Sequence, residues 1–377
     1  MDGAVSRRAR DEIRLSPEEF RLLRELFNQH GGLYFGPESR LSMERRLRER
    51  VVMLSLHSFG DYYAYLRSNS RGRAELDEAI DVITVNETYF FREDYQLRAL
   101  KNEIVPMLVN SGAAKTRLSI WSAGCSTGEE VYSIAIVARE AGLLGGREVR
   151  VLGSDISRRC VVAARKGVYS ASSFRVTPPE TKRRYFVERA DGAHVVDELR
   201  ALCQFGHLNL LDASRAAVVG RVDIIFCRNV LIYLDEASRR KVIETFYERL
   251  IPGGFLLLGH SESLLNVSTA FELVHLREDL IYRKPAARLR VSASQALAAI
   301  EAARGGASVS LTLTAPTGDD LNPAPLGAAP DAAGAGAAGT PDGPTSGRTT
   351  PDVSAPAKAV PDGPRGMLPF QKPSSSV

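Results

Sequence analysis

Residues 119–136, SIWSAGCSTGEEVYSIAI, place two glycines and two acidic residues between an apolar stretch and a helical one. Gly124 and Gly128 stand four residues apart, so the segment has neither the GxGxxG pattern of dinucleotide turns nor the GxxxxGK[ST] pattern of phosphate loops. It also lacks a lysine, and Glu129 would repel a phosphate. The turn is therefore suited to the close approach of a neutral or cationic ligand.

A second acidic group follows the next apolar stretch. Asp155 comes 31 residues after Gly124, where a carboxylate can accept hydrogen bonds from ribose hydroxyls. S-adenosylmethionine fits both features, because it carries a ribose and a sulfonium but no phosphate, and its carboxylate is favoured at a helix N-terminus. The alternative is a purely structural role, with tight strand–helix packing at the turn and a helix N-cap at Asp155. This alternative is less favoured because the glycine turn and the acidic residue occur together and in this order.

The segment TVNETYFFRE, residues 84–93, precedes the glycine turn and mixes polar and aromatic side chains. Asn86, Thr88 and Arg92 are polar residues among three consecutive aromatic ones. One interpretation is a loop that contributes polar groups to a ligand site. The other is a loop anchored in the core by its aromatic rings, with Arg92 in solvent.

The segment IIFCRNVLIYLD, residues 224–235, combines a buried strand pattern with polar residues at its end. The strand is expected to end near Arg228 and Asn229, at the ligand edge of a sheet. Tyr233 follows four residues later, within reach of a transferred group. The alternative is that Asn229 and Tyr233 only complete a turn before the next helix.

A shorter segment, NLLD at 209–212, ends another strand-like stretch. Asn209 and Leu210 could face the edge and the plane of an adenine. On its own this segment is equally compatible with an ordinary turn.

These segments need strands that end at one edge of a sheet. Between about 83 and 286, apolar strand-like stretches alternate with helical ones, which predicts an α/β domain with a parallel sheet covered on both faces. Ligands of such sheets bind at the carboxyl ends of the strands. Residues 180–208 interrupt the alternation and predict a small antiparallel β insertion.

Residues 1–82 are predicted to form an all-helical domain. Ser16 as N-cap, Pro17 and Glu19 give the start signals of a helix, and the glycines at 31–32 end it. A second helix is expected over about 38–56. Its polar face carries four arginines: Arg45, Arg46, Arg48 and Arg50.

The C-terminal part has a different composition. Of the 19 prolines, 13 lie at or after Pro285, and no aromatic residue occurs between Arg283 and Pro369. Such a segment cannot bury enough apolar surface to offset its ordering entropy. We therefore expect residues 287–377 to form a low-complexity, largely disordered tail.

Composition excludes several classes of function. The net charge of +4 is too small to indicate nucleic-acid binding, and no uninterrupted apolar run is long enough for a membrane span. The four cysteines form no CxxC pair, so we expect neither a zinc site nor a disulfide framework. The sequence fits a cytoplasmic, reduced, monomeric protein that does not insert into membranes.

In order and spacing, six segments resemble the CheR-type chemotaxis protein-glutamate O-methyltransferases: TVNETYFFRE, WSAGCSTGEEVYSIAI, GSDIS, NLL, FCRNVLIY and GHSE. The resemblance covers about 12–284. It implies a small all-α domain for receptor docking, then a Rossmann-like class I S-adenosylmethionine methyltransferase sheet with a small antiparallel β insertion. It also implies methylation of glutamate side chains on chemoreceptor cytoplasmic helices, for sensory adaptation.

The resemblance further implies roles for individual residues. Arg92 and Tyr233 would stand nearest the transferred methyl and act as catalytic residues. The implied cofactor-binding residues are Asn86, Thr88, Arg92, Glu129, Asp155, Asn209, Leu210, Arg228 and Asn229.

The implied reaction is an in-line displacement that gives a glutamate methyl ester and S-adenosylhomocysteine. The acceptor is already ionised at pH 7, because the ordinary pKa of glutamate is about 4.3. Neither a metal nor a strong general base is needed, so catalysis is expected to be mostly positioning. The Tyr233 hydroxyl would orient the incoming carboxylate, and Arg92 would offset its charge or anchor the cofactor.

Receptor docking is assigned to the arginine-rich helix over 38–56, whose charge complements acidic receptor helices. The alternative is a solvated helix face with internal ion pairs. RRLRER offers no aromatic platform for nucleic acid.

Two competing functions remain open. One is a catalytically weak or inactive signalling adaptor that keeps the methyltransferase fold, although the intact Asn86, Arg92, Asp155, Asn229 and Tyr233 argue against it. The other is a methyltransferase for a small molecule or RNA, which rests on fold analogy alone.

Overall fold

The computed structural model describes residues 13–68, 70–112, 116–143 and 146–286, and the structural statements below concern these residues. All of them belong to one compact unit, Met1–Leu297. The expected tail over 287–377 lies outside the described residues.

The first described part of the chain is helical. Its elements are α2 (Pro17–Gly31), the 3-10 helix η1 (Pro37–Ser39), α3 (Arg40–Met53), α4 (Phe59–Ser68) and α5 (Ser70–Ile83). The expected start signals are confirmed, because Ser16 and Glu19 form a reciprocal capping box. Gly32 ends the helix in the left-handed conformation, with φ of +69°.

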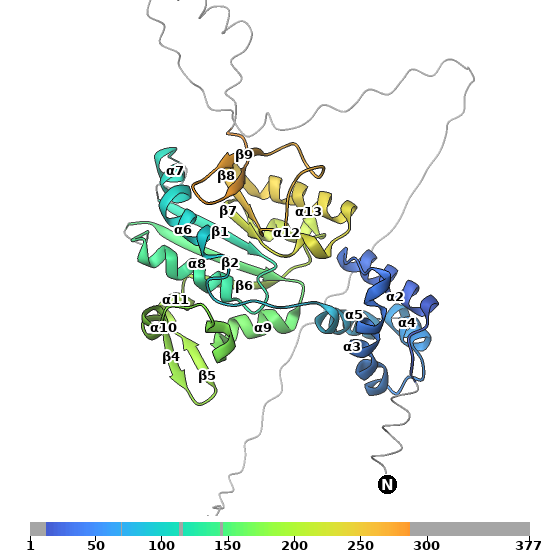
Figure 1. Cartoon of the computed structure of the whole chain (residues 1–377). Helices are drawn as coiled ribbons and strands as arrows, with labels where there is room; N and C mark the ends of the chain where they lie inside the picture. The colour runs from blue at the N-terminus through green and yellow to red at the C-terminus, as the bar shows by residue number, and fades with distance from the viewer. Residues whose placement is uncertain (1–12, 69, 113–115, 144–145, 287–377) are drawn as a thin grey trace, which may run out of the picture. The chain divides into compact units, whose positions relative to one another are not determined.

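A seven-stranded sheet forms the centre of the second part, in the order β6-β2-β1-β7-β8-β10-β9 (Figure 1). The strands are β1 (Arg117–Ala123), β2 (Glu148–Asp155), β6 (Cys203–His207), β7 (Val222–Cys227), β8 (Leu250–Leu258), β9 (Glu272–His275) and β10 (Leu280–Arg283). β6, β2, β1, β7 and β8 pair in parallel, whereas β10 is antiparallel to β8 and β9. The predicted Rossmann-like α/β class is confirmed.

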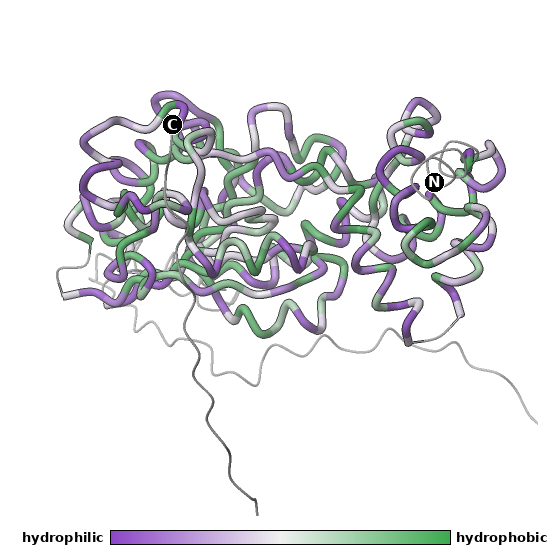
Figure 2. The backbone as a smooth tube through the Cα atoms, turned by 90° about the horizontal axis from the view of Figure 1, so that it is seen from below, coloured by the Kyte–Doolittle hydropathy of each residue, from purple (hydrophilic) through white to green (hydrophobic). Residues whose placement is uncertain are grey.

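Helices precede β1 and connect the parallel strands that follow it. They are α6 (Asp94–Ala99), the π-helical turn η2 (Leu100–Ile104), α7 (Val105–Asn110), α8 (Glu129–Glu140), α9 (Arg158–Lys166), α12 (Ala213–Ala216), the 3-10 helices η4 (Ala217–Val219) and η5 (Leu231–Tyr233), and α13 (Glu236–Arg249). Segments coloured hydrophilic and hydrophobic alternate along these helices (Figure 2), as expected where one helix side packs and the other is solvated.

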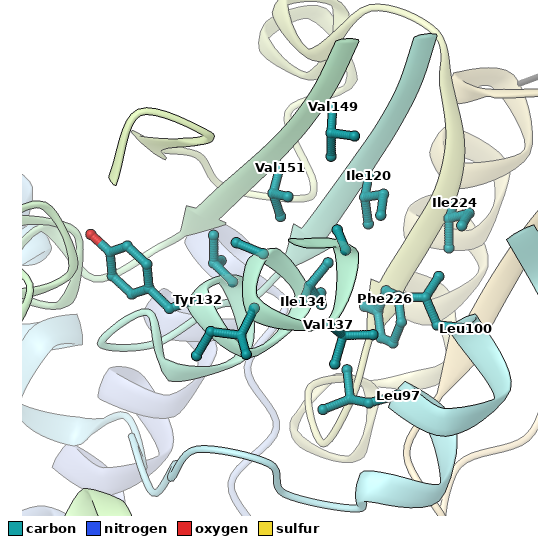
Figure 3. Packing of buried hydrophobic residues seen from close by; sticks show 14 of the residues in the cluster. Leu97, Leu100, Ile120, Tyr132, Ile134, Val137, Val149, Val151, Ile224 and Phe226 are labelled. Carbon is teal, nitrogen blue, oxygen red and sulfur yellow. The ribbon is translucent and has the colours of Figure 1, made fainter. Parts of the chain in front are cut away.

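Alternate residues of the central strands enter two hydrophobic clusters. Ile224 and Phe226 of β7 belong to one cluster, and Ile225 and Cys227 belong to the other. Figure 3 shows the first cluster, where Ile134 of α8 lies among side chains of the strands. The second cluster contains α13 and also the buried side chains of α2 to α5, so the helical part shares a core with one face of the sheet.

The antiparallel insertion exists, but its predicted bounds of 180–208 need correction. Its sheet has the order β3-β5-β4, from β3 (Val168–Tyr169), β4 (Phe186–Arg189) and β5 (Gly192–Val195). η3 (Ala171–Phe174) and α10 (Pro179–Tyr185) lie between β3 and β4, and α11 (Asp197–Arg200) follows β5. The strand β6 instead pairs with β2 in the main sheet. As a half-buried edge strand it lacks the apolar run that marks the inner parallel strands.

Candidate active site

A cavity of about 350 Å³ opens where β1, β2 and β7 end. Residues from the helical part and from the 84–93 loop complete its walls. Nine of the predicted site residues line it: Asn86, Thr88, Arg92, Asp155, Asn209, Leu210, Arg228, Asn229 and Tyr233. The separate sequence segments are thus brought to one site.

The glycine turn follows β1 and approaches the side chain of Val230 closely. Gly124 has φ of +80°, and a Cβ atom added to it would lie 2.4 Å from Cγ2 of Val230. Gly128 has φ of +95° and directly precedes α8. Both positions therefore require glycine, because of backbone conformation and because an added Cβ would clash, at Gly128 with Ala164 Cβ at 2.8 Å.

Asp155 ends β2 and holds the same turn in place. Its Oδ2 accepts a hydrogen bond from the backbone N–H of Ser126 at 2.8 Å, and its Oδ1 accepts one from Ser157 at 2.8 Å. Burial raises the pKa of the carboxyl, and the backbone N–H groups oppose this shift. Asp155 thus joins the glycine turn to the start of α9 while it lines the cavity.

Glu129 does not line the cavity. Its carboxylate is 3% exposed and accepts hydrogen bonds from Thr127 Oγ1 at 2.6 Å and from Ser173 Oγ at 3.0 Å. Burial raises the pKa of this carboxyl, and the hydroxyl donors oppose the shift. Glu129 therefore connects α8 to the β insertion, outside the lining of the cavity in which the sequence analysis expected it.

Glu130 is the acidic residue of the turn that lines the cavity. Ser122 Oγ donates a hydrogen bond to its Oε1 at 2.8 Å, and Nη1 of Arg228 lies 3.5 Å from its Oε2. Burial raises the pKa of this carboxyl, whereas the charge of Arg228 lowers it.

Arg228 is the buried cation of the site, with a side chain that is 3% exposed. It pairs with Glu130 and with Glu93, whose Oε2 lies 3.6 Å from Nη2, and it donates a hydrogen bond to the carbonyl of Arg92. Its Nε has no hydrogen-bond partner within the described chain, and neither does Oδ1 of Asn229. A buried donor and a buried acceptor are thus left for a ligand with both kinds of polar group.

The 84–93 loop serves both interpretations made from the sequence. Phe90 is fully buried against Tyr169, Phe174 and Phe186 of the insertion, so an aromatic ring does anchor the loop. Arg92 nevertheless lines the cavity, where its Nη1 donates a hydrogen bond to the carbonyl of Glu87 at 2.9 Å. The loop thus has one ring buried in the insertion and polar side chains in the cavity lining.

The helical part supplies one wall of the cavity through residues 31–46. Leu33 forms an antiparallel bridge with Leu234, and the N–H of Tyr34 donates to the carbonyl of Tyr233 at 2.8 Å. Asn209 Nδ2 donates to the carbonyl of His30 at 2.6 Å. Tyr233 itself is 38% exposed, which places its side chain at the rim.

The four arginines expected to form a docking face do not share one environment. Arg45 is exposed, whereas Arg46 lines the cavity and donates to the carbonyls of Ile83 at 2.9 Å and Thr84 at 3.0 Å. Arg48 pairs with the buried carboxylate of Glu44, and Arg50 pairs with Glu75 and Glu78. The expectation of a single basic face needs correction, because three of these side chains have partners within the fold.

Glu130 and Arg46 line the cavity although the sequence pattern did not assign them to it. Glu130 stands beside Glu129 in the same turn, and the sequence pattern does not distinguish these two neighbours. Glu262 belongs to the GHSE segment and accepts backbone hydrogen bonds from the residues around Asn229. Among the described residues, no cluster of His, Cys, Asp or Glu could hold a metal ion.

A pair of substitutions tests the assignment of the two neighbouring acids. Glu129→Gln is expected to leave the affinity for S-adenosylhomocysteine within about 3-fold, because its hydroxyl neighbours can also pair with an amide. Glu130→Gln is expected to weaken binding by about 10-fold or more, since it disturbs a charged hydrogen-bond network in the cavity wall. Calorimetric titration of both variants measures this difference, and the reverse order would return Glu129 to the cofactor site.

No helix in the described part of the chain is both long and apolar enough to cross a membrane.

Two family models match the chain. The CheR methyltransferase all-alpha domain matches residues 18–84, and the CheR methyltransferase SAM binding domain matches residues 86–280. Chemotaxis protein methyltransferase 2 of Vibrio cholerae serotype O1 is 38% identical over 277 residues, which cover 73% of this chain and 96% of that protein. The chemotaxis protein methyltransferase of Klebsiella aerogenes is 35% identical over 288 residues, or 74% and 94% of the two chains.

Proposed function

Because the chain belongs to the CheR methyltransferase family, we propose that it methylates glutamate side chains on the cytoplasmic helices of chemoreceptors. The products are glutamate methyl esters and S-adenosylhomocysteine, and the role is sensory adaptation. The observation that carries this proposal is the cavity at the ends of β1, β2 and β7. It brings together the carboxylate of Asp155, the buried guanidinium of Arg228 and, at the rim, the side chain of Tyr233.

The lining fits S-adenosylmethionine. The free Nε of Arg228 and the free Oδ1 of Asn229 match a ligand that carries a carboxylate and an amine. Asp155 has two carboxylate oxygens, each with one backbone donor, so acceptor capacity remains for ribose hydroxyls. The bound cofactor supplies an activated methyl group on a sulfonium. Asn86, Thr88, Asn209 and Leu210 are proposed to complete its site.

The acceptor carboxylate is proposed to enter at the rim. A glutamate has an ordinary pKa of about 4.3, so it arrives ionised at pH 7 and no proton need be removed. The guanidinium groups of Arg46 and Arg92 both line the cavity and offset the charge of the entering carboxylate. Tyr233 then orients the carboxylate oxygen, so the contribution of the protein is mainly positioning and charge.

Tyr233→Phe tests this role. The substitution is expected to lower kcat by about 10-fold, the effect of one lost hydrogen bond, and to leave S-adenosylhomocysteine affinity within about 2-fold. Initial rates with saturating cofactor, together with calorimetric titration, separate the two quantities. Loss of cofactor binding with an unchanged kcat would exclude Tyr233 as the acceptor-orienting residue.

The reaction is tested with labelled S-adenosylmethionine and cytoplasmic fragments of candidate chemoreceptors. We expect label on the receptor fragment that base treatment releases, because a methyl ester is hydrolysed by base. A base-stable product would exclude the glutamate ester. Cofactor binding that cannot be detected would instead favour the adaptor role.

The organisation of the chain is part of the proposal. We propose a helical region over 1–82, a catalytic region over 83–286 and a tail over 287–377, in a monomeric cytoplasmic protein. Within the helical region, exposed Arg45 remains a candidate for contact with acidic receptor helices. The rate constant for association with the receptor is expected to fall as ionic strength rises.

A further inference from the structure

Glu262 lies in the segment after β8, and its carboxylate is surrounded by backbone donors. Oε2 accepts hydrogen bonds from the N–H groups of Asn229 and Gly259, each at 2.8 Å. Oε1 accepts from Val230 at 2.9 Å and from Ile232 at 3.3 Å. Three of the four donors belong to the single turn that leaves β7.

This turn has an unusual backbone conformation. Asn229 has φ of +58°, a left-handed value that asparagine tolerates better than most residues but still at a cost. The chain then enters η5, which ends at Tyr233. The N–H groups of residues 229, 230 and 232 point to Glu262 rather than along a strand or helix ladder, so the carboxylate supplies the partners that the turn lacks.

The space around the carboxylate is tightly filled. A Cβ atom at Gly259 would lie 2.8 Å from Glu262 Oε2 and 2.9 Å from the Asn229 nitrogen. The glycine therefore permits the carboxylate to approach the turn. The same turn presents Val230 against Gly124, so its position also affects the cofactor turn.

We propose that Glu262 is a positioning residue of the methyltransferase site. Its carboxylate fixes the turn at 229–233, which carries the side chain of Asn229 into the cavity and that of Tyr233 to the rim. The part that concerns Tyr233 rests on the proposed function. Glu262 does not itself line the cavity, so it acts through the residues that it holds.

A double-mutant cycle with Glu262→Gln and Tyr233→Phe tests the link to turnover. Gln keeps the size of the side chain but replaces one acceptor oxygen with a donor that faces backbone N–H groups. We expect Glu262→Gln alone to lower kcat by about 10- to 30-fold, near the lower end of the range for hydrogen bonds to a charged group. In the Tyr233→Phe background the further fall should be at most about 3-fold, because both changes remove the same positioned hydroxyl.

Glu272→Gln is the matched control, since Glu272 is exposed and pairs with Arg283 on the neighbouring strand β10. It should change kcat by less than about 2-fold. Equal kcat losses for Glu262→Gln in both backgrounds would overturn a role through Tyr233.

Backbone hydrogen exchange provides a readout that needs no acceptor substrate. In Glu262→Gln, exchange of the amides of residues 229, 230 and 232 should increase by at least about 10-fold, while the amides of α2 keep wild-type rates. If Glu262→Gln fails to fold, Glu262→Asp, which keeps the charge on a shorter side chain, is measured in its place. Unchanged exchange at the three amides would overturn the positioning role. A wild-type protein that methylates no receptor fragment would refute the proposed function, and the exchange result would still decide the role of Glu262.

Discussion

Replacing Arg228 with methionine is expected to lower the free energy of unfolding by about 3–5 kcal/mol, the usual cost of removing one partner from a buried ion pair. The side chain of Arg228 is 3% exposed and lies between Glu93 and Glu130. Methionine fills much of the same space but carries no charge. The loss of stability is therefore expected to come from the buried carboxylates that remain without their cation. The affinity for the cofactor should fall together with the free energy of unfolding.

A second substitution distinguishes the effect of unpaired carboxylates from an effect of lost side-chain packing in Arg228→Met. Adding Glu130→Gln to Arg228→Met removes one of the two unpaired carboxylates, so part of the lost stability should return. Because Arg228 and Glu130 interact directly, their effects should not add. The double variant should lose less free energy of unfolding than the sum of the losses in the two single variants. Chemical denaturation with urea measures all three free energies of unfolding.

Arg98→Met serves as the control for Arg228→Met. Arg98 also pairs with two carboxylates, those of Asp94 and Glu278, but its side chain is 50% exposed. Exposed pairs contribute at most about 1 kcal/mol, so this variant should be nearly as stable as the wild type. Equal losses at Arg98 and Arg228 would show that burial of the charge cluster is not what makes Arg228 important.

Asp155→Ala is expected to weaken S-adenosylhomocysteine binding by about 100-fold. The change removes a charged acceptor from the cavity wall, and it leaves the N–H groups of Ser126 and Ser157 without their partner. Ser126 belongs to the glycine turn and has φ of +49°, a costly conformation for a residue other than glycine, and its N–H donates to Asp155. Calorimetric titration at a temperature where both proteins are folded gives the change in affinity.

Asp155→Asn and Asp197→Ala refine the interpretation. Asparagine keeps one acceptor oxygen, so its binding should lie between those of the wild type and Asp155→Ala. Asp197 is exposed at the start of α11 and does not line the cavity, and its removal should leave affinity within about 2-fold. Wild-type affinity in Asp155→Ala would remove Asp155 from the cofactor site.

The sequence was sufficient to predict elements that depend on local periodicity. The helix from Pro17 to Gly31 has its start and stop signals within the segment, and the inner strands have apolar runs that only buried strands carry. The ligand edge followed from topology, because parallel strands end on the same side. Asp155 and Arg228 could thus be assigned to one cavity although 73 residues separate them.

The orientation of Glu129 and Glu130 could not be predicted in the same way. These neighbours begin α8, where successive side chains differ in direction by about 100°. Which of them faces the cavity depends on how the turn through Gly128 joins the helix to β1. That geometry is set by tertiary contacts, such as the one between Glu129 and Ser173, and these contacts leave no local pattern.

The prediction of a single basic face on α3 was wrong for a related reason. A basic helix face is read from residue types on that helix alone. The partners of Arg46 are backbone carbonyls at the C-terminal end of α5, and the main partner of Arg50 is Glu75 on α5. Charge on a helix predicts solvation or docking only when neighbouring elements leave it unpaired, and the sequence did not show how α3 and α5 pack.

The bridge between Leu33 and Leu234 bears on how such proteins can be recombined. The two family-model regions meet near residue 85, yet the first supplies a wall of the second's cavity and shares its hydrophobic core. The contacts involve backbone groups of residues 30–34 and the side chain of Asn209. A chimera that takes its helical region from a relative must therefore also match residues 209 and 233–235. The unit to exchange between relatives is therefore the pair of regions rather than the helical region alone.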